Sequence, residues 1–133
     1  MRQHFPRSIE SLDPIFAFTE AFFEAKDVDE SLLRTVSFAI EELFTNMVKY
    51  NAAGPEEILL ELTPIAGGVE VSLVDFDTEP FDPTQSRAAK VDGPIEDRPV
   101  GGLGLHLIKK MVDSLRYEYA DRRSTVTFTR TVN

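Results

Sequence analysis

The sequence predicts an α+β fold in which helices pack on a sheet. Two long stretches in the first fifty residues place apolar residues at helical spacing. Two shorter segments then alternate apolar and polar residues on either side of Gly67-Gly68, a pattern typical of an antiparallel hairpin. A third helical pattern precedes two segments rich in Thr, Val, Tyr and Phe. Because helices and sheets each bury an apolar face, these elements predict two packed layers around one core.

Composition limits the classes of function. The 133 residues suit one domain, and 42% hydrophobic residues with ten Phe can build its core. The absence of cysteine excludes disulfides, thiolate metal sites and cysteine nucleophiles. The 23 acidic and 14 basic residues give a formal charge of -9, which disfavours direct nucleic-acid binding. No apolar run approaches the roughly 18 residues of a membrane span, so we expect a cytoplasmic protein without a membrane partner.

The first half of the chain predicts an edge strand followed by two helices. Residues 2–9 are short and mixed, as an edge strand would be. Ser11 can cap a helix that extends to about Ala25, and Asp29 can cap a longer helix that ends near Asn51. The longer helix carries one apolar stripe and should face the core. That stripe consists of Leu32, Val36, Ala39, Ile40, Leu43 and Met47.

The second half predicts a hairpin, a long loop, a helix and two more strands. Residues 58–63 and 69–74 form the hairpin. From Asp75 to Gly102 prolines, glycines and charges replace the periodic pattern. We interpret this loop as a lid, because a loop of that length in a small domain is typically functional. Three regular segments follow, a helix at 103–115 and strands at 116–120 and 124–131.

Glu42 and Asn46 stand four residues apart on the longer helix. At about 100° per residue both lie beside Leu43 and Met47, next to each other at the edge of the buried stripe. A carboxylate and a carboxamide placed there can share a metal ion or a water. An ordinary solvated polar face has the same spacing, although Asn is disfavoured in mid-helix because its side chain competes for backbone hydrogen bonds.

Gly101, Gly102 and Gly104 end the long loop and begin the third helix. Glycines let the backbone approach a ligand closely, and the free N–H groups of a helix start favour a phosphate. No strand leads into these glycines and no Lys-Ser/Thr pair follows them, so neither the dinucleotide fingerprint nor the P-loop fits. A flexible hinge before a helix is the alternative interpretation.

Asp75 and Asp77 stand where the second hairpin strand leaves the sheet. Either carboxylate can accept a hydrogen bond from an exocyclic amine such as that of adenine, and an ordinary acidic turn is the alternative. The only histidines, His4 and His106, are far apart in the sequence, which disfavours a zinc site.

In their order and spacing these motifs resemble the ATP-binding fold shared by DNA gyrase B, sensor histidine kinases and bacterial anti-sigma-factor serine kinases. The N box of that superfamily is similar to Glu42, Asn46 and Tyr50. Its two glycine boxes are similar to residues 75–83 and to Gly102-Leu103-Gly104-Leu105. The small anti-sigma-factor serine-protein kinases are similar in three further segments, PFDP at 80–83, GGLGL at 101–105 and the closing VDSLRYEYADRRSTVTFTR.

The resemblance implies an architecture and a nucleotide site. The fold would be a two-layer α/β sandwich with a mixed, mainly antiparallel sheet, with residues 1–133 as one ATP-binding domain and a lid at about 77–102. ATP and Mg²⁺ would be the cofactors, with Asn46 as metal ligand and Glu42 as general base. The implied nucleotide contacts are Asn46, Asp75, Asp77, Gly101, Gly102, Leu103, Gly104, Leu105 and Thr127.

The implied reaction transfers the γ-phosphate of ATP to a serine of a STAS-domain anti-sigma antagonist. Phosphorylation adds about two negative charges, which would release that partner from an acidic surface. A sigma factor is the other implied partner, and the resemblance also implies a homodimer.

The first glycine box departs from the superfamily pattern, which has Asp-x-Gly before Pro-Phe. The corresponding stretch has no glycine, and if Pro80-Phe81 anchors the register, Phe76 takes the aspartate position. A turn one residue longer would let Asp75 or Asp77 bind adenine, and we favour Asp75. A degraded box would instead make the chain a non-catalytic partner-switching domain. A module that binds another anionic ligand at the third helix start is a further hypothesis.

Overall fold

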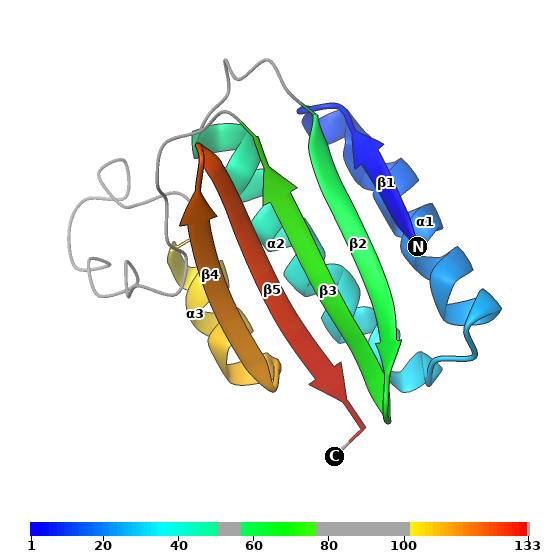
Figure 1. Ribbon diagram of the computed structural model, residues 1–133. Coiled ribbons are helices and arrows are strands. Elements are labelled where there is room, and N and C mark those ends of the chain that lie inside the picture. Colours follow the sequence, from blue (N-terminus) through cyan, green and yellow to red (C-terminus); the bar gives the residue numbers. More distant parts are fainter. Residues whose placement is uncertain (51–56, 77–101, 133) are drawn as a thin grey trace.

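Three α-helices cover one face of a five-stranded sheet in the computed structural model (Figure 1). The structure describes residues 1–50, 57–76 and 102–132. The strand order is β1-β2-β3-β5-β4, and each described pair of neighbours is antiparallel. The predicted two-layer α+β sandwich is confirmed, with an antiparallel rather than a mixed sheet, because no two described neighbours run in the same direction. The elements are β1 (Arg2–Phe5), α1 (Leu12–Ala25), α2 (Leu33–Tyr50), β2 (Ile58–Ile65), β3 (Gly68–Asp75), α3 (Gly102–Met111), β4 (Ser114–Ala120) and β5 (Arg123–Thr131).

A short 3-10 turn precedes α1 and changes its capping. The hydroxyl of Ser8 accepts a hydrogen bond from the amide of Glu10 at 3.2 Å, so Ser8 caps this turn. Ser11 occupies the N-cap position of α1, but its hydroxyl donates to the carbonyl of Pro6 at 2.7 Å instead of capping the helix. The prediction that the Ser11 side chain caps α1 is therefore wrong, because helical turns begin before that residue.

The longest described helix, α2, packs its apolar stripe against the sheet. Asp29 accepts a hydrogen bond from the amide of Ser31 at 2.9 Å and caps the 3-10 turn that leads into α2. Every residue of the predicted stripe is buried, none more than 6% exposed, which confirms the predicted core-facing side. No helix in the described part of the chain is long and apolar enough to cross a membrane.

The inner face of the sheet completes the core beneath α2. In the register, Leu73 pairs with Leu60 on one side and Val126 on the other, and Val71 pairs with Phe128. All five side chains are buried. Successive side chains of a strand point to opposite faces. The last residue of β3 and every second residue before it therefore face α2.

The third helix is shorter than predicted. The amide of Asp113 donates to the carbonyl of Thr129 at 2.8 Å, so the chain already follows β5 there and β4 begins at Ser114. The predicted continuation of the helix to Leu115 is therefore wrong. Leu105 and Ile108 are buried as expected, whereas the other two predicted inward residues, Met111 and Val112, are half-buried. The predicted lid at 77–102 lies outside the described residues except for Gly102.

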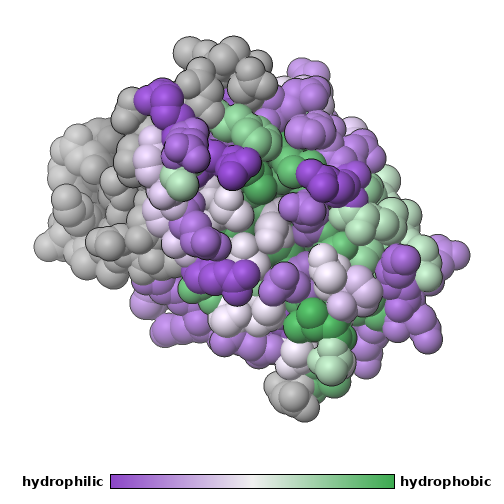
Figure 2. Space-filling view, viewed as in Figure 1, coloured by the Kyte–Doolittle hydropathy of each residue, from purple (hydrophilic) through white to green (hydrophobic). Residues whose placement is uncertain are grey.

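None of the described helices covers the opposite face of the sheet, which we call the open face (Figure 1). Figure 2 shows this face as a mixture of hydrophilic and hydrophobic residues. The open face includes Thr125, Thr127 and Thr129 of β5, which alternate with the apolar residues that point into the core. Side chains on this face are separated from α2 by the full thickness of the sheet.

We expect Gly68→Ala to destabilise the protein. A Cβ at Gly68 would lie 2.8 Å from Cα of Thr131 and overlap the carbonyl of Arg130, both in the backbone of β5. Because that backbone cannot move without loss of pairing, the free energy of unfolding in chemical denaturation should fall by about 1–3 kcal/mol. Gly67→Asn is the control, because asparagine tolerates the φ of 75° at this position. Equal losses in both variants would contradict the register of β3 and β5.

Candidate functional site

The α2 helix holds Asn46 and Glu42 one turn apart at the edge of the core. Asn46 is only 3% exposed, and its amide nitrogen donates to the backbone carbonyl of Glu42 at 2.6 Å. A carbonyl oxygen can only accept, so the nitrogen of the Asn46 amide must face it. The amide oxygen is then the atom that can bind a ligand, and an amide oxygen is a ligand that Mg²⁺ accepts.

The carboxylate of Glu42 lies directly against the first turn of α3. A Cβ at Gly104 would lie within 2.5 Å of Cδ of Glu42 and overlap its Oε2. Glycine is therefore the residue that allows this close approach. The predicted glycine motif and the predicted Glu42/Asn46 pair, some sixty residues apart in the sequence, meet at this point.

Burial changes the acidity of Glu42. Partial desolvation raises the pKa of its carboxyl group, the nearby charge of Glu41 raises it further, and Lys49 opposes the shift. The ionised form is disfavoured in the folded protein, so this carboxylate binds a proton more readily than a free glutamate does. A raised pKa brings a carboxylate closer to the range in which a general base is efficient.

Asp75 ends β3 on the inner face of the sheet, where it is 2% exposed. The next residue, Phe76, points to the outer face, where its ring centroid lies 6.1 Å from that of His4. Among the alternatives left open by the altered glycine box, the structure thus places Asp75 on the α2 side of the sheet. Asp77 lies outside the described residues.

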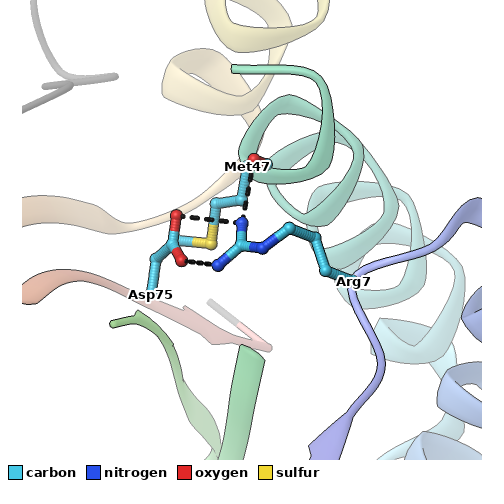
Figure 3. A network of polar contacts seen from close by, with 3 residues as sticks. All are labelled: Arg7, Met47 and Asp75. Atoms are coloured by element: carbon cyan, nitrogen blue, oxygen red, sulfur yellow. Dashed lines mark hydrogen bonds and ion pairs between the residues drawn. The ribbon is translucent and has the colours of Figure 1, made fainter. Parts of the chain in front are cut away.

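Arg7 binds Asp75 in a buried ion pair (Figure 3). Its two terminal nitrogens each contact one carboxylate oxygen, Nη1 at 3.3 Å from Oδ2 and Nη2 against Oδ1. Nη1 also donates to the carbonyl of Met47 in the last turn of α2 at 3.3 Å. The sequence analysis did not single out Arg7, because one arginine in an irregular linker has no periodic or motif signal.

Ser124 is a second polar residue that was not among the predicted site residues. It pairs directly with Asp75 across β3 and β5, is buried, and its hydroxyl lies 3.2 Å from that of Tyr117. Ser124 stands two residues before the apolar Val126 in β5, and this spacing could have predicted that both side chains point inward.

Thr127 does not lie near the other predicted site residues. It is buried on the outer face, with its hydroxyl 3.0 Å from that of Ser72, so the sheet separates it from Glu42. The alternation of apolar Val126 and Phe128 with the threonines of β5 could have predicted this orientation.

The other predicted glycine-box residues surround the start of α3. Gly102 is the first residue of the helix, and Leu105 is buried in the core at 3% exposed. Gly101 and the side chain of Leu103 lie outside the described part. No three His, Cys, Asp or Glu side chains gather as a metal site in residues 1–50, 57–76 and 102–132.

These residues fit a magnesium nucleotide. The oriented amide oxygen of Asn46 offers a hard oxygen ligand, and the amino-terminal end of α3 offers a favourable potential for phosphate. Asn46 would be the residue that holds Mg²⁺, and the ion would neutralise phosphate charge.

Two solved structures have a similar fold. The crystal structure of the RsbU and RsbW domains of Rv1364c from Mycobacterium tuberculosis matches with a TM-score of 0.69 and 16% identity, covering 98% of this chain and 31% of that chain. The crystal structure of the SiaB-SiaC complex from Pseudomonas aeruginosa matches with a TM-score of 0.67 and 16% identity, covering 97% of this chain and 88% of that chain. This chain therefore spans about a third of the Rv1364c chain. No curated protein matches the sequence.

The sequence also matches a protein family over almost its full length. The profile of the histidine kinase-like ATPase domain covers residues 5–130. That span contains Glu42, Asn46, Asp75 and Gly104, the residues that the structure arranges around α2 and the start of α3. The resemblance stated from the motifs is thus confirmed, and the chain belongs to the histidine kinase-like ATPase domain family.

Proposed function

We propose that the chain is an ATP-dependent serine-protein kinase and anti-sigma factor that regulates a sigma factor by partner switching. Its substrate would be a serine of a STAS-type anti-sigma antagonist. The contact between the Glu42 carboxylate and Gly104 carries the proposal, because it joins a base to a helix start that favours phosphate. The fold likeness to an RsbW domain and to SiaB supports the same class.

Each residue of the site has a chemical role in this proposal. Asn46 holds the metal through its amide oxygen, and the backbone N–H groups at the start of α3 receive phosphate charge. Glu42 accepts the proton of the substrate hydroxyl as the serine oxygen bonds to the γ-phosphorus and the bond to ADP breaks. Asp75 receives a hydrogen bond from the exocyclic amine of adenine. Bound Mg-ATP supplies the phosphoryl group.

A second candidate is a non-catalytic partner-switching domain of the same fold. Its support is the state of Asp75, whose two oxygens are already engaged by Arg7. The lack of a glycine in the altered box points in the same direction. Phosphate transfer from labelled ATP to a STAS-domain partner distinguishes the two functions, because label on the partner serine excludes the second.

We expect Glu42→Gln to abolish transfer while it keeps nucleotide binding and stabilises the protein. Loss of a general base should lower kcat by about 10²–10⁴-fold. Because the pKa of Glu42 is raised in the folded state, stability falls as the pH rises from the unfolded pKa through the folded pKa, so the glutamine variant should melt slightly higher at pH 7. This gain should vanish below pH 4.5, the ordinary pKa of a glutamate, where the carboxyl group of wild type is protonated in the folded and the unfolded state.

Glu41→Gln is the matched control for Glu42→Gln, because it removes the adjacent charge without touching Gly104. Transfer to the partner and scanning calorimetry are measured for both variants. Undiminished transfer in Glu42→Gln would exclude Glu42 as the base.

Gly104→Ala should separate the position of Glu42 from its chemistry. The new Cβ would displace the flexible end of the Glu42 side chain, and a displacement of about 1 Å can lower a rate by about 10²-fold. We expect kcat to fall while circular dichroism and the melting temperature stay close to wild type. His106→Ala, on the exposed side of α3, should leave kcat unchanged. Equal kcat in both variants would contradict this geometry.

Nucleotide affinity should depend on Mg²⁺. The formal charge of -9 opposes a bare triphosphate, so titration calorimetry should show weak ATP binding in chelator and a marked gain with Mg²⁺. Asn46→Ala should lose most of this gain. Thr45→Val is the control, because the Thr45 hydroxyl donates to the same Glu42 carbonyl at 3.2 Å without offering an amide oxygen. Absence of any Mg-dependent adenine nucleotide binding would rule out the kinase.

A further inference from the structure

The ion pair between Arg7 and Asp75 is buried where three parts of the chain meet. Arg7 belongs to the linker between β1 and α1, Asp75 ends β3, and the carbonyl of Met47 belongs to the last turn of α2 (Figure 3). The side chains of Arg7 and Asp75 are 4% and 3% exposed. Burial at this level removes the solvent that would otherwise stabilise either charge, so each depends on the other.

This dependence determines what Asp75 can offer a ligand. An ionised carboxylate only accepts hydrogen bonds, whereas a protonated one can also donate. A guanidinium only donates hydrogen bonds, so both oxygens of Asp75 act as acceptors in their contacts with Arg7. A ligand that meets Asp75 must therefore present a hydrogen-bond donor.

The ion pair between Arg7 and Asp75 leaves some of its own hydrogen-bonding positions unused. Arg7 uses its two terminal nitrogens, one for each oxygen of Asp75, and each of these oxygens keeps a further acceptor position. Nε of Arg7 is buried and has no hydrogen-bond partner among the described residues. A buried ion pair with a purely structural role would be expected to satisfy all of its polar atoms. The remaining acceptor positions and the unpaired donor thus point to a polar ligand or water at this place.

We propose that Arg7 determines the nucleobase selectivity of the site by holding Asp75 as an acceptor, so that a 6-aminopurine is preferred to a 6-oxopurine. Arg7 acts through Asp75 and is a positioning residue. The inference rests on the proposed nucleotide site and adds a residue from outside the recognised motifs.

The preference can be measured as the ratio of dissociation constants for IDP and ADP with Mg²⁺, because the two nucleotides differ in the group at C6. ADP offers a donor amine at C6, whereas IDP has an acceptor oxygen at C6 and its donor at N1; an acceptor held opposite C6 should therefore prefer ADP by about tenfold or more, the equivalent of one well-formed hydrogen bond. In Arg7→Gln the carboxylate of Asp75 loses the two guanidinium contacts that fix its orientation, so its free acceptor positions are no longer held toward a 6-amino group. The ratio should then fall to within about twofold of one. Arg7→Lys, which keeps the charge, should retain most of the preference.

Arg2→Gln is the matched control. Arg2 is a second arginine near the amino terminus. It lies in β1 and forms an exposed ion pair with Glu61 of β2 at 3.9 Å. This variant should keep the wild-type ratio. Partial unfolding of an Arg7 variant weakens the apparent binding of both nucleotides equally, so the ratio still reports selectivity when stability falls. Asp75→Asn should also bring the ratio close to one, because an amide both donates and accepts.

The outcomes separate this inference from the proposed function. If wild type binds neither nucleotide, the nucleotide site and the role of Arg7 fail together. If wild type prefers ADP and Arg7→Gln keeps the full ratio, the site stands and the role of Arg7 is overturned. A wild-type ratio of the IDP and ADP dissociation constants in Asp75→Asn would overturn the role of Arg7 as well. Loss of the ratio in Arg7→Gln, with retention in Arg7→Lys and Arg2→Gln, supports it.

Discussion

The packing of α2 on the inner face of the sheet is the contact on which the rest of the structure depends. The helix buries its apolar stripe in the core beneath the sheet, which fixes its rotation about its own axis. Glu42 and Asn46 lie at the edge of that stripe, so this rotation also fixes where their polar atoms point. A shift of one residue would turn the helix surface by about 100° and remove both from the site. The hydrophobic core therefore positions the polar chemistry.

The close approach of α3 places the start of a helix beside the carboxylate of Glu42, and together they form the candidate site. Gly104 lets the helix start lie against the Glu42 carboxylate, and the same approach shields that carboxylate from water. Shielding raises the pKa of Glu42 and makes its charged form unfavourable in the folded state. Such a destabilised group is common where a protein uses a carboxylate for proton transfer. The proposed catalytic role and the local instability of Glu42 thus have one physical origin.

The buried charge of Asp75 at the end of β3 is neutralised by Arg7, which lies among the first ten residues of the chain. Arg7 joins Asp75 to the last turn of α2, so one guanidinium connects the end of β3, the central helix and the amino-terminal linker. The altered glycine box thus coincides with a carboxylate that already has a partner. Because a buried ion pair is sensitive to the loss of either member, the local structure around Asp75 depends on Arg7.

The sequence alone determined the layers, the stripe of α2, the hairpin around Gly67-Gly68 and the adjacency of Glu42 and Asn46. Each of these follows from spacing within a few residues, which helical and strand periodicity make visible. Tertiary structure decided the partner of Arg7, the position of Ser124 opposite Asp75, and the early end of α3. These features depend on which strands pair and in what register. Contacts between residues as distant in sequence as Arg7 and Asp75 leave no periodic signal, so only the folded chain could show them.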